Sequence, residues 1–225
     1  MKVSVIVPAF NEEKYIKACI ESLQNQTVKA AEIIVVDNNC TDRTIEIASK
    51  FDVRIVQEPK QGMTYSRAKG FSSGKSEILA RCDADSQLPT NWIERIVYNF
   101  TKRRHIDALI GLNTVYDFPI KNVKLINKAS VYLIKEIAGH YPLFGSSMAI
   151  KKKIWDEIKD DLCDDNFEYH EDVDISVHIH KLGGIIVFDP HFESQFSARR
   201  FKRDPYEIFV EYPSRILKTI RGHKI

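Results

Sequence analysis

Apolar positions in the first hundred residues follow two different periodicities. Short continuous apolar runs are typical of strands that are buried on both faces of a parallel sheet, and they occur at residues 2–7, 32–37, 53–56 and 77–81. Between these runs, apolar residues recur every three or four positions, which predicts helices at residues 11–24, 65–72 and 91–100. A further helix is expected to begin near Asp42, with Thr41 as its cap.

The second half of the chain has a less regular pattern. It predicts helices at residues 123–138 and 171–181, a polar loop at residues 160–166, and strands at residues 108–113, 147–150 and 185–188. The last strand is expected to end at Asp189-Pro190. Repeated strand–helix units, with no linker or internal repeat between them, predict a single α/β domain. We expect a Rossmann-like, mostly parallel central sheet flanked by helices.

Acidic side chains stand at two predicted strand ends and at one helix start. Asp37 ends the second strand, Asp83-Ala84-Asp85 follows the fourth, and Glu171-Asp172 opens a helix after the polar loop. Ligands of such sheets bind beyond the carboxyl ends of the strands. Hard oxygen ligands suit Mg²⁺ or Mn²⁺, which would neutralise charge on a departing nucleoside diphosphate. The sequence therefore predicts a metal site at Asp83-Ala84-Asp85.

Each of these carboxylates also has a purely structural interpretation. Two aspartates around one residue are common in solvated turns, and Asp37 suits a turn or cap. Glu171 and Asp172 would stabilise the start of a helix through its dipole. The functional alternatives are hydrogen bonding of Asp37 to a nucleobase or ribose, and proton transfer at the Glu171-Asp172 pair.

Composition narrows the class of protein but not its chemistry. With 225 residues, 44% hydrophobic and 28% charged, the chain has an ordinary globular composition. It has no apolar run of the roughly 18 residues that span a bilayer, and its amino terminus predicts a strand, so we expect a cytoplasmic protein. Residues 199–225 carry eight basic and three acidic side chains, a net charge of +5, which favours phosphate groups or an anionic membrane surface as a neighbour.

Cysteines and histidines do not indicate a zinc centre. The four cysteines form no CxxC pair, so we expect thiols and not a zinc ribbon or a disulfide framework: Cys19, Cys40, Cys82 and Cys163. His170, His178 and His180 are spaced like a helix face or a loop, and no cysteine or carboxylate completes a site with them. His191 is a candidate third ligand of the Asp83-Ala84-Asp85 metal, the alternative being a surface or packed histidine.

Six segments resemble glycosyltransferase family 2 in their order and spacing. They are the opening strand, the second-strand motif of two aspartates around a polar turn, a glycine segment, the metal-binding triplet, the acceptor-side glycine segment and the Glu-Asp motif: residues 3–12, 32–42, 62–70, 83–85, 145–151 and 170–174. One departure is Ala68, which stands where the family usually has asparagine. The resemblance implies a GT-A fold, an inverting mechanism and a nucleotide-sugar donor.

The resemblance also assigns roles by position. On the donor side it implies that Pro8, Phe10 and Glu12 line the nucleotide pocket, that Asp37 binds the base and that Arg67 lies near the donor. At the metal it implies that Asp83 contacts ribose or metal and that Asp85 binds Mn²⁺ or Mg²⁺. It further implies that Gly145, Ser146 and Glu171 lie on the acceptor side and that Asp172 is the catalytic base. We expect partial burial to raise the pKa of Asp172. Residues 1–100 would then bind the nucleotide-sugar, residues 101–201 the acceptor, and residues 202–225 would form a basic helical tail.

The carboxyl-terminal region departs from polymer-forming members of the family. Residues 195–200 lack the tryptophan of their Gln-x-x-Arg-Trp motif, so a processive synthase is not expected. Arg199 and Arg200 are instead expected to reach the diphosphate from a loop that closes on donor binding. Residues 206–220, interrupted by Pro213, either lie on an anionic membrane at its cytoplasmic face or pack against the domain or a second subunit in a homodimer.

Three other functions were weighed against a glycosyltransferase. A sugar-phosphate nucleotidyltransferase needs a glycine-rich loop with a basic residue after the first strand, and residues 8–11 offer neither. A non-catalytic nucleotide-sugar-binding module would be expected to have lost Asp85 or Asp172. Nucleic-acid binding has no motif to support it. Family frequency favours UDP in the donor, and the acceptor is expected to be a glycan or a lipid-linked precursor.

Overall fold

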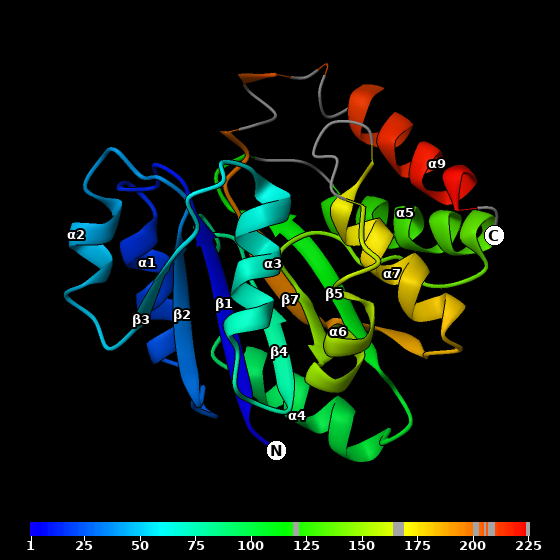
Figure 1. Ribbon diagram of the computed structural model, residues 1–225, viewed down its shortest axis with the longest axis horizontal. Coiled ribbons are helices and arrows are strands. Elements are labelled where there is room, and N and C mark those ends of the chain that lie inside the picture. The colour runs from blue at the N-terminus through cyan, green and yellow to red at the C-terminus, as the bar shows by residue number, and fades with distance from the viewer. Residues whose placement is uncertain (119–121, 164–168, 200–202, 205, 207–209, 224–225) are drawn as a thin grey trace.

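Seven strands form one sheet in this computed structural model, which describes residues 1–118, 122–163, 169–199, 203–204, 206 and 210–223 (Figure 1). The strands lie in the order β3-β2-β1-β4-β6-β5-β7. Neighbouring strands run parallel except at β6, which is antiparallel to both β4 and β5. The expectation of a mostly parallel α/β sheet is confirmed.

The strands are β1 (Val3–Ala9), β2 (Glu32–Asp37), β3 (Arg54–Gln57), β4 (Ile78–Arg81), β5 (Ala108–Val115), β6 (Met148–Lys151) and β7 (Ile186–Phe196). The helices are α1 (Ile16–Gln24), α2 (Thr44–Ala48), α3 (Met63–Ser73), α4 (Trp92–Lys102), α5 (Val123–Ala138), α6 (Lys152–Ile158), α7 (Glu171–Lys181) and α9 (Tyr212–Gly222). Helices α1, α2 and α4 pack on one face of the sheet, and α3, α5, α6 and α7 pack on the other.

Burial on both faces explains the continuous apolar runs. In β1, Val5 and Val7 belong to the core under α1 and α4, whereas Ile6 points into the core under α3. Gly70 lets α3 approach the sheet, because a Cβ atom there would lie 2.3 Å from Ile6 Cγ2. Helix α3 therefore packs directly on β1 and β2.

Sequence patterns placed β2, α5 and α7 at their observed bounds but misplaced two helix starts. The helix expected at residue 11 begins at Ile16, because Asn11 has a positive φ of 55° and its side chain binds the loop after β2. Thr41 is not a cap: α2 begins at Thr44, whose N–H donates to Asp42 Oδ1. Both starts were misplaced because side-chain contacts between two distant loops replace local helix signals.

Three features of the second half also differ from expectation. Strand β7 does not end at Asp189-Pro190 but continues to Phe196, paired with β5 across a register shift at Ile110 and Leu112. Helix α6 was not predicted, since its seven residues are too few for a clear periodicity. Pro213 does not interrupt the tail helix but lies in the first turn of α9, where a missing N–H costs nothing.

The apolar side of α9 packs against the domain. Ile216 and Ile220 lie with Val173 and Val177 of α7 and with Ala138 of α5. The described part of the tail therefore packs against the domain through this face. Across the part of the chain that the structure describes, no helix combines the length and the apolar character needed to cross a bilayer.

Candidate active site

The loops after β1 and β2 are locked together at the carboxyl edge of the sheet. Asn11 Oδ1 accepts the N–H of Thr41 at 2.8 Å, the Glu12 N–H donates to Thr44 Oγ1 at 2.7 Å, and the Glu13 N–H donates to Asp42 Oδ2 at 3.0 Å. These bonds satisfy backbone donors that no strand or helix uses. They fix the direction in which the residues after β1 present their side chains.

A cleft of about 490 Å³ opens beside these loops. It is lined by Phe10, Asn11, Glu12, Met63, Arg199, Arg203 and Asp204. Phe10 is 49% exposed at its rim, so a planar ligand could stack there without moving the core. Of the three residues expected in a nucleotide pocket, Phe10 and Glu12 line this cleft, whereas Pro8 is paired with Val36 inside the sheet and does not line it.

Arg199 closes one side of the cleft by joining two strand ends. Its guanidinium pairs with Glu12, its Nε lies 3.3 Å from Asp85 Oδ2, and it covers the ring of Tyr15 with 4.6 Å to the ring centroid. Burial would lower the pKa of Arg199, but Glu12 and Asp85 outweigh it and raise the pKa above its ordinary value. A permanent positive charge therefore stands against Asp85. Arg200, its predicted partner, lies outside the described residues.

Asp37 and Asn38, at the end of β2, form hydrogen bonds to the loops that follow β2 and β3. Asp37 Oδ1 accepts the Cys40 N–H at 2.9 Å, which is the turn role that its position allowed. Asn38, only 3% exposed, donates to the carbonyls of Glu58 and Lys60 and accepts the Gly62 N–H at 2.9 Å. Asn38 therefore fixes the loop that leads into α3. Sequence analysis missed it, although a polar residue directly after a buried strand was a usable signal.

Arg67 of α3 reaches three carboxylates from different elements. It forms an ion pair with Glu171, and its guanidinium lies 3.4 Å from Asp172 Oδ1 and 3.7 Å from Asp83 Oδ1. Its side chain is only 8% exposed, so these charges interact with little screening by water. Arg67 thus connects Asp83, which follows β4, with the Glu-Asp pair that opens α7.

Asp172 lies beneath this arginine and meets a second one. Arg81, the last residue of β4, donates to both of its oxygens at 2.6 and 2.8 Å and donates to the Gly145 carbonyl at 2.5 Å. Arg81 is completely buried and the Asp172 side chain is 2% exposed. Because a buried unpaired ion is costly, each holds the other in place. Arg81 was missed, yet an arginine closing an apolar strand was its visible signal.

The electrostatics of Asp172 contradict the sequence expectation. Burial would raise its pKa, but the positive charges of Arg67 and Arg81 outweigh burial and lower the pKa to about 2. The predicted rise is therefore wrong, because it counted burial without a buried arginine as partner. At neutral pH Asp172 is ionised. Next to it, burial lowers the pKa of His170 to about 4, so this histidine is neutral.

Gly145 and Ser146, which are expected on the acceptor side, lie beside Arg81 at the end of β4. Gly145 has a φ of +77°, and a Cβ atom there would lie 2.5 Å from the Asn113 side chain, so glycine is required. The Ser146 N–H donates to Asn113 Oδ1 at 2.8 Å, and its hydroxyl lies 2.6 Å from that of Ser194. Asn113 and Ser194, which sequence analysis did not single out, position this turn above Arg81.

His191 is not brought to the predicted metal triplet. It is exposed on β7, and its N–H donates to Asp189 Oδ1. Among the described residues there are two groups of potential metal ligands, and within each group the ligand atoms lie within 4.8 Å of one another. Neither group includes His191, Asp83 or Asp85. One group is His170, Glu171 and Asp172, where Arg67 and Arg81 already supply positive charge.

Asp83 and Asp85 nevertheless fit a hard divalent cation by their chemistry. Both carboxylates follow β4, the Asp83 side chain is 34% exposed, and Asp85 contacts Arg199, which lines the cleft. Arg199 provides the charge that a cation would otherwise provide at Asp85. Their oxygens are the ligands that Mg²⁺ and Mn²⁺ prefer.

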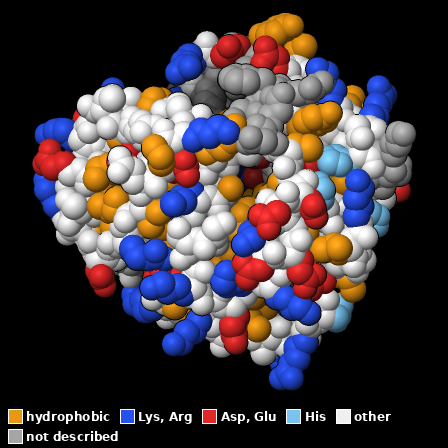
Figure 2. Space-filling model, in the orientation of Figure 1, with side chains coloured by type: hydrophobic (Ala, Val, Ile, Leu, Met, Phe, Trp, Pro, Cys, Tyr) orange, Lys and Arg blue, Asp and Glu red, His pale blue; other side chains and the backbone are white. Residues whose placement is uncertain are grey.

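The face in Figure 2 carries basic and acidic side chains intermingled over its described part. A nucleic-acid-binding face would concentrate one positive sign along a groove or stripe. This view therefore gives no support to nucleic-acid binding.

Comparisons with known proteins point in one direction. Residues 4–158 match the family described as Glycosyl transferase family 2. Glycosyltransferase GlyG of Streptococcus pneumoniae is 32% identical over 60% of this chain and 47% of its own length. Cholesterol galactosyltransferase of Borreliella burgdorferi is 33% identical over 55% of this chain and 35% of its own. The chain thus spans less than half of each of these relatives.

Solved structures resemble the fold over nearly the whole chain. Glucosyl-3-phosphoglycerate synthase from Mycobacterium tuberculosis, in complex with Mn²⁺, UDP and phosphoglyceric acid, aligns with a TM-score of 0.70 at 18% identity, covering 99% of this chain and 78% of the other. S. aureus TarS 1-349, in complex with UDP-GlcNAc, aligns with a TM-score of 0.66 at 19% identity, covering 88% and 58%. At this identity the likeness shows a shared GT-A fold.

Proposed function

The chain belongs to glycosyl transferase family 2, and from that premise we propose that it moves a sugar from a UDP-sugar to an acceptor hydroxyl with inversion. The observation that carries the proposal is the placement of two charged groups. Asp85 contacts Arg199 of the cleft lining and Asp83 contacts Arg67, whereas Asp172 is buried between Arg67 and Arg81. A single displacement needs such a division, because the nucleophile enters opposite the leaving group.

Residues at the cleft are suited to the donor. Phe10 offers an exposed ring for the base, and Arg199 offers a charged fork for the diphosphate. UDP is the proposed nucleotide because two structural neighbours were solved with UDP or a UDP-sugar. The acceptor is proposed to be a glycan or a lipid-linked precursor.

Asp83 and Asp85 would hold Mn²⁺ or Mg²⁺ with the donor. When bound, the cation neutralises the charge that develops on the departing diphosphate. Arg199 contacts Asp85, so it is also placed to bind the diphosphate that the cation would bind. Glu12 shares this arginine, which keeps its guanidinium oriented toward the cleft.

Asp172 is the proposed base that takes the proton of the attacking hydroxyl. Its lowered pKa keeps it ionised, as a base must be, but also makes it a weak proton acceptor. Most of the acceleration must then come from positioning the hydroxyl and stabilising the leaving group. Arg81 takes one lone pair of each oxygen and leaves others for the acceptor hydroxyl, but the Asp172 side chain is only 2% exposed, so acceptor binding has to open a path to it.

The test is Asp172→Asn, assayed with a panel of UDP-sugars and Mn²⁺ by UDP release and by direct UDP binding. We expect transfer to fall by about 10²–10⁴-fold, the usual contribution of a general base, with UDP affinity retained. Asp156→Asn, which alters an exposed carboxylate of α6, is the matched control. Thermal unfolding of each variant separates loss of the base from loss of the fold.

Glu171→Gln completes this experiment, since Glu171 is the neighbouring carboxylate and its side chain is 11% exposed. Full transfer by a folded Asp172→Asn protein would overturn the assignment. If Glu171→Gln then lost transfer, the base would be Glu171. Absence of UDP release with every donor in the wild-type chain would contradict the proposed donor class.

A further inference from the structure

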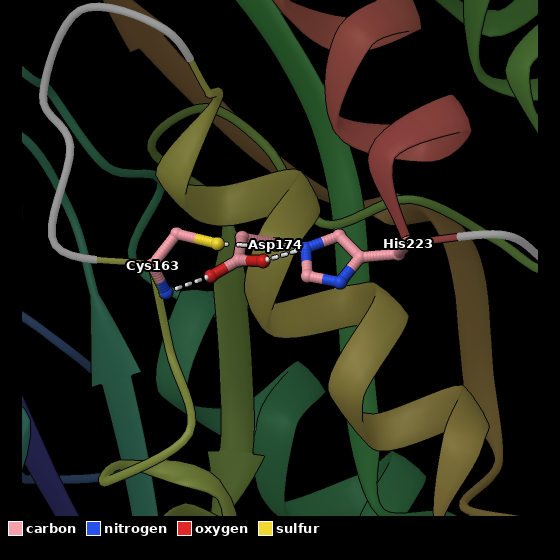
Figure 3. Close-up of side chains that lie close together, drawn as sticks. All are labelled: Cys163, Asp174 and His223. Atoms are coloured by element: carbon pink, nitrogen blue, oxygen red, sulfur yellow. Dashed lines mark hydrogen bonds and ion pairs between the residues drawn. The ribbon is translucent and has the colours of Figure 1, made fainter.

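A second cluster of reactive side chains lies on the far side of α7 from Asp172. Cys163 precedes α7, Asp174 is in its first turn, and His223 follows α9 (Figure 3). Residues two apart on a helix are rotated by about 200°, so Asp174 points away from Arg81 and toward α9. The proposed transferase function therefore leaves this cluster unexplained.

Three side-chain atoms of different chemistry converge in this cluster. His223 Nε2 lies 2.6 Å from Asp174 Oδ1 and 3.6 Å from Cys163 Sγ. The three candidate ligand atoms all lie within 4.8 Å of one another, and Asp174 is only 1% exposed. The other oxygen of Asp174 accepts the Cys163 N–H at 2.8 Å, which fixes the carboxylate in this orientation.

A single hydrogen-bonded relay does not account for the whole convergence. In a catalytic thiol–imidazole–carboxylate relay, the carboxylate and the thiol bind different nitrogens of the ring. Here both approach the same nitrogen of His223. Among the described residues, Asp174 Oδ1 has no well-aligned hydrogen bond despite its proximity to that nitrogen. Several lone pairs that face one point are the arrangement that a shared cation satisfies.

The spacing and ligand types favour one class of cation. Zinc–sulfur and zinc–nitrogen bonds of about 2.3 and 2.05 Å place sulfur and nitrogen roughly 3.6 Å apart in a tetrahedron. The observed separation between Cys163 Sγ and His223 Nε2 is 3.6 Å. A corresponding nitrogen–oxygen separation is about 3.3 Å, so Asp174 and His223 need to move apart by less than 1 Å.

We propose that Cys163, Asp174 and His223 bind a zinc-class divalent cation at a site separate from the Asp83 and Asp85 metal. A thiolate and an imidazole select Zn²⁺ over Mn²⁺ or Mg²⁺, whereas Asp83 and Asp85 offer only oxygen. His178 Nε2 lies 3.5 Å from Asp174 Oδ1 but is not one of the three converging ligand atoms, so the site proposed here consists of Cys163, Asp174 and His223.

Lys181 opposes metal binding and therefore gives the proposal a directional test. Its ammonium lies 3.3 Å from His223 Nδ1, so in this state it donates to that nitrogen. A cation on Nε2 leaves a proton on Nδ1, which needs an acceptor and not a second donor. Lys181 is exposed and can turn into solvent. Lys181→Glu would place an acceptor there.

The site would connect the tail to the region of the proposed base. The His170 N–H donates to Thr219 Oγ1 of α9 at 2.8 Å, two residues before Asp172. A pocket of about 200 Å³ is lined by Cys163 and Asp174 and also by Arg67 and Glu171. A cation bound by residues of α7 and the end of α9 would hold this wall of the pocket in place.

The experiment is titration of the EDTA-stripped full chain with Co²⁺, a coloured substitute for Zn²⁺. We expect one equivalent to produce a thiolate-to-cobalt charge-transfer absorption that Zn²⁺ abolishes and that excess Mn²⁺ leaves unchanged. Cys163→Ser should lose this absorption and His223→Ala should weaken Co²⁺ binding at least about tenfold. Cys40→Ser is the matched control, because Cys40 is also half-buried but lies beside β2.

Lys181→Glu should bind Co²⁺ about tenfold more tightly, the size of effect expected of a partner to a ligating histidine. An unchanged spectrum in Cys163→Ser would overturn the site, as would the absence of the absorption in the wild-type chain. Weaker binding by Lys181→Glu would contradict the assignment of Nε2. The readout does not depend on sugar transfer, so it fails or succeeds independently of the proposed function.

Discussion

The proposed donor edge, formed by the loops after β1 and β2, and the proposed acceptor side, around Asp172 and Arg81, are built in different ways. At the donor edge, Asn11 and Asp42 hold neighbouring loops through hydrogen bonds that are exposed or half-buried. On the acceptor side, Asp172 and Arg81 are 91 positions apart and meet in the interior. The first region is shaped by local motifs, the second by an ion pair that requires the completed fold.

This difference separates the two regions energetically. An exposed ion pair contributes little because water and salt screen it, whereas breaking a buried pair leaves an unsatisfied charge. Changes at the donor edge should therefore alter ligand binding with little effect on folding. Changes around Asp172 should alter folding and chemistry together, and need a structural control.

The largest expected effect is on stability, from Arg81→Met. Methionine fills similar space but leaves Asp172 beside Arg67 alone, so we expect a loss of about 3–5 kcal/mol in the free energy of unfolding. Urea unfolding measures it. The donor-edge counterpart is Arg43→Met: Arg43 lies 3.7 Å from Glu13 and its side chain is 72% exposed, so this change should cost about 1 kcal/mol or less.

Equal losses in the two variants would remove the proposed contrast. The double variant Arg81→Met with Asp172→Asn removes both charges of the buried pair. It should recover part of the lost stability, because no unpaired carboxylate remains in the interior. Failure to recover any would mean that Arg81 acts through its contact with the Gly145 carbonyl.

The same contrast explains what the sequence could predict. The hydrophobic periodicity predicted strand β2 and helices α5 and α7. The acidic residues at the end of β2 and after β4 were identified as candidate site residues by their position in the chain. The pairing of Arg81 with Asp172, and with it the pKa of Asp172, could not be predicted, since it depends on a contact between β4 and α7. The convergence of Cys163, Asp174 and His223 was missed for the same reason.

An intermediate effect is expected for Asp85→Ala, which tests the donor metal. Loss of a ligand should abolish the dependence of UDP release on Mn²⁺ and lower kcat by roughly 100-fold, because several kcal/mol of leaving-group stabilisation disappear. Asp52→Ala, at an exposed carboxylate before β3, is the control. A variant that still responds to Mn²⁺ with the wild-type concentration dependence would show that Asp85 does not bind the metal.

The smallest effect is expected for Arg199→Ala, which tests the role of the donor edge in diphosphate binding. Arg199 contacts Glu12 and Asp85, so its loss should weaken UDP binding about tenfold, or about 1.4 kcal/mol, while removing one competing positive charge from the Asp85 carboxylate. We therefore expect Mn²⁺ to bind more tightly as UDP binds less tightly, both measured by calorimetry. A merely structural arginine would move both affinities in the same direction. Arg200→Ala, measured beside it, separates the two basic residues, and unchanged UDP affinity in both variants and in the double variant would end the idea that this segment binds the diphosphate.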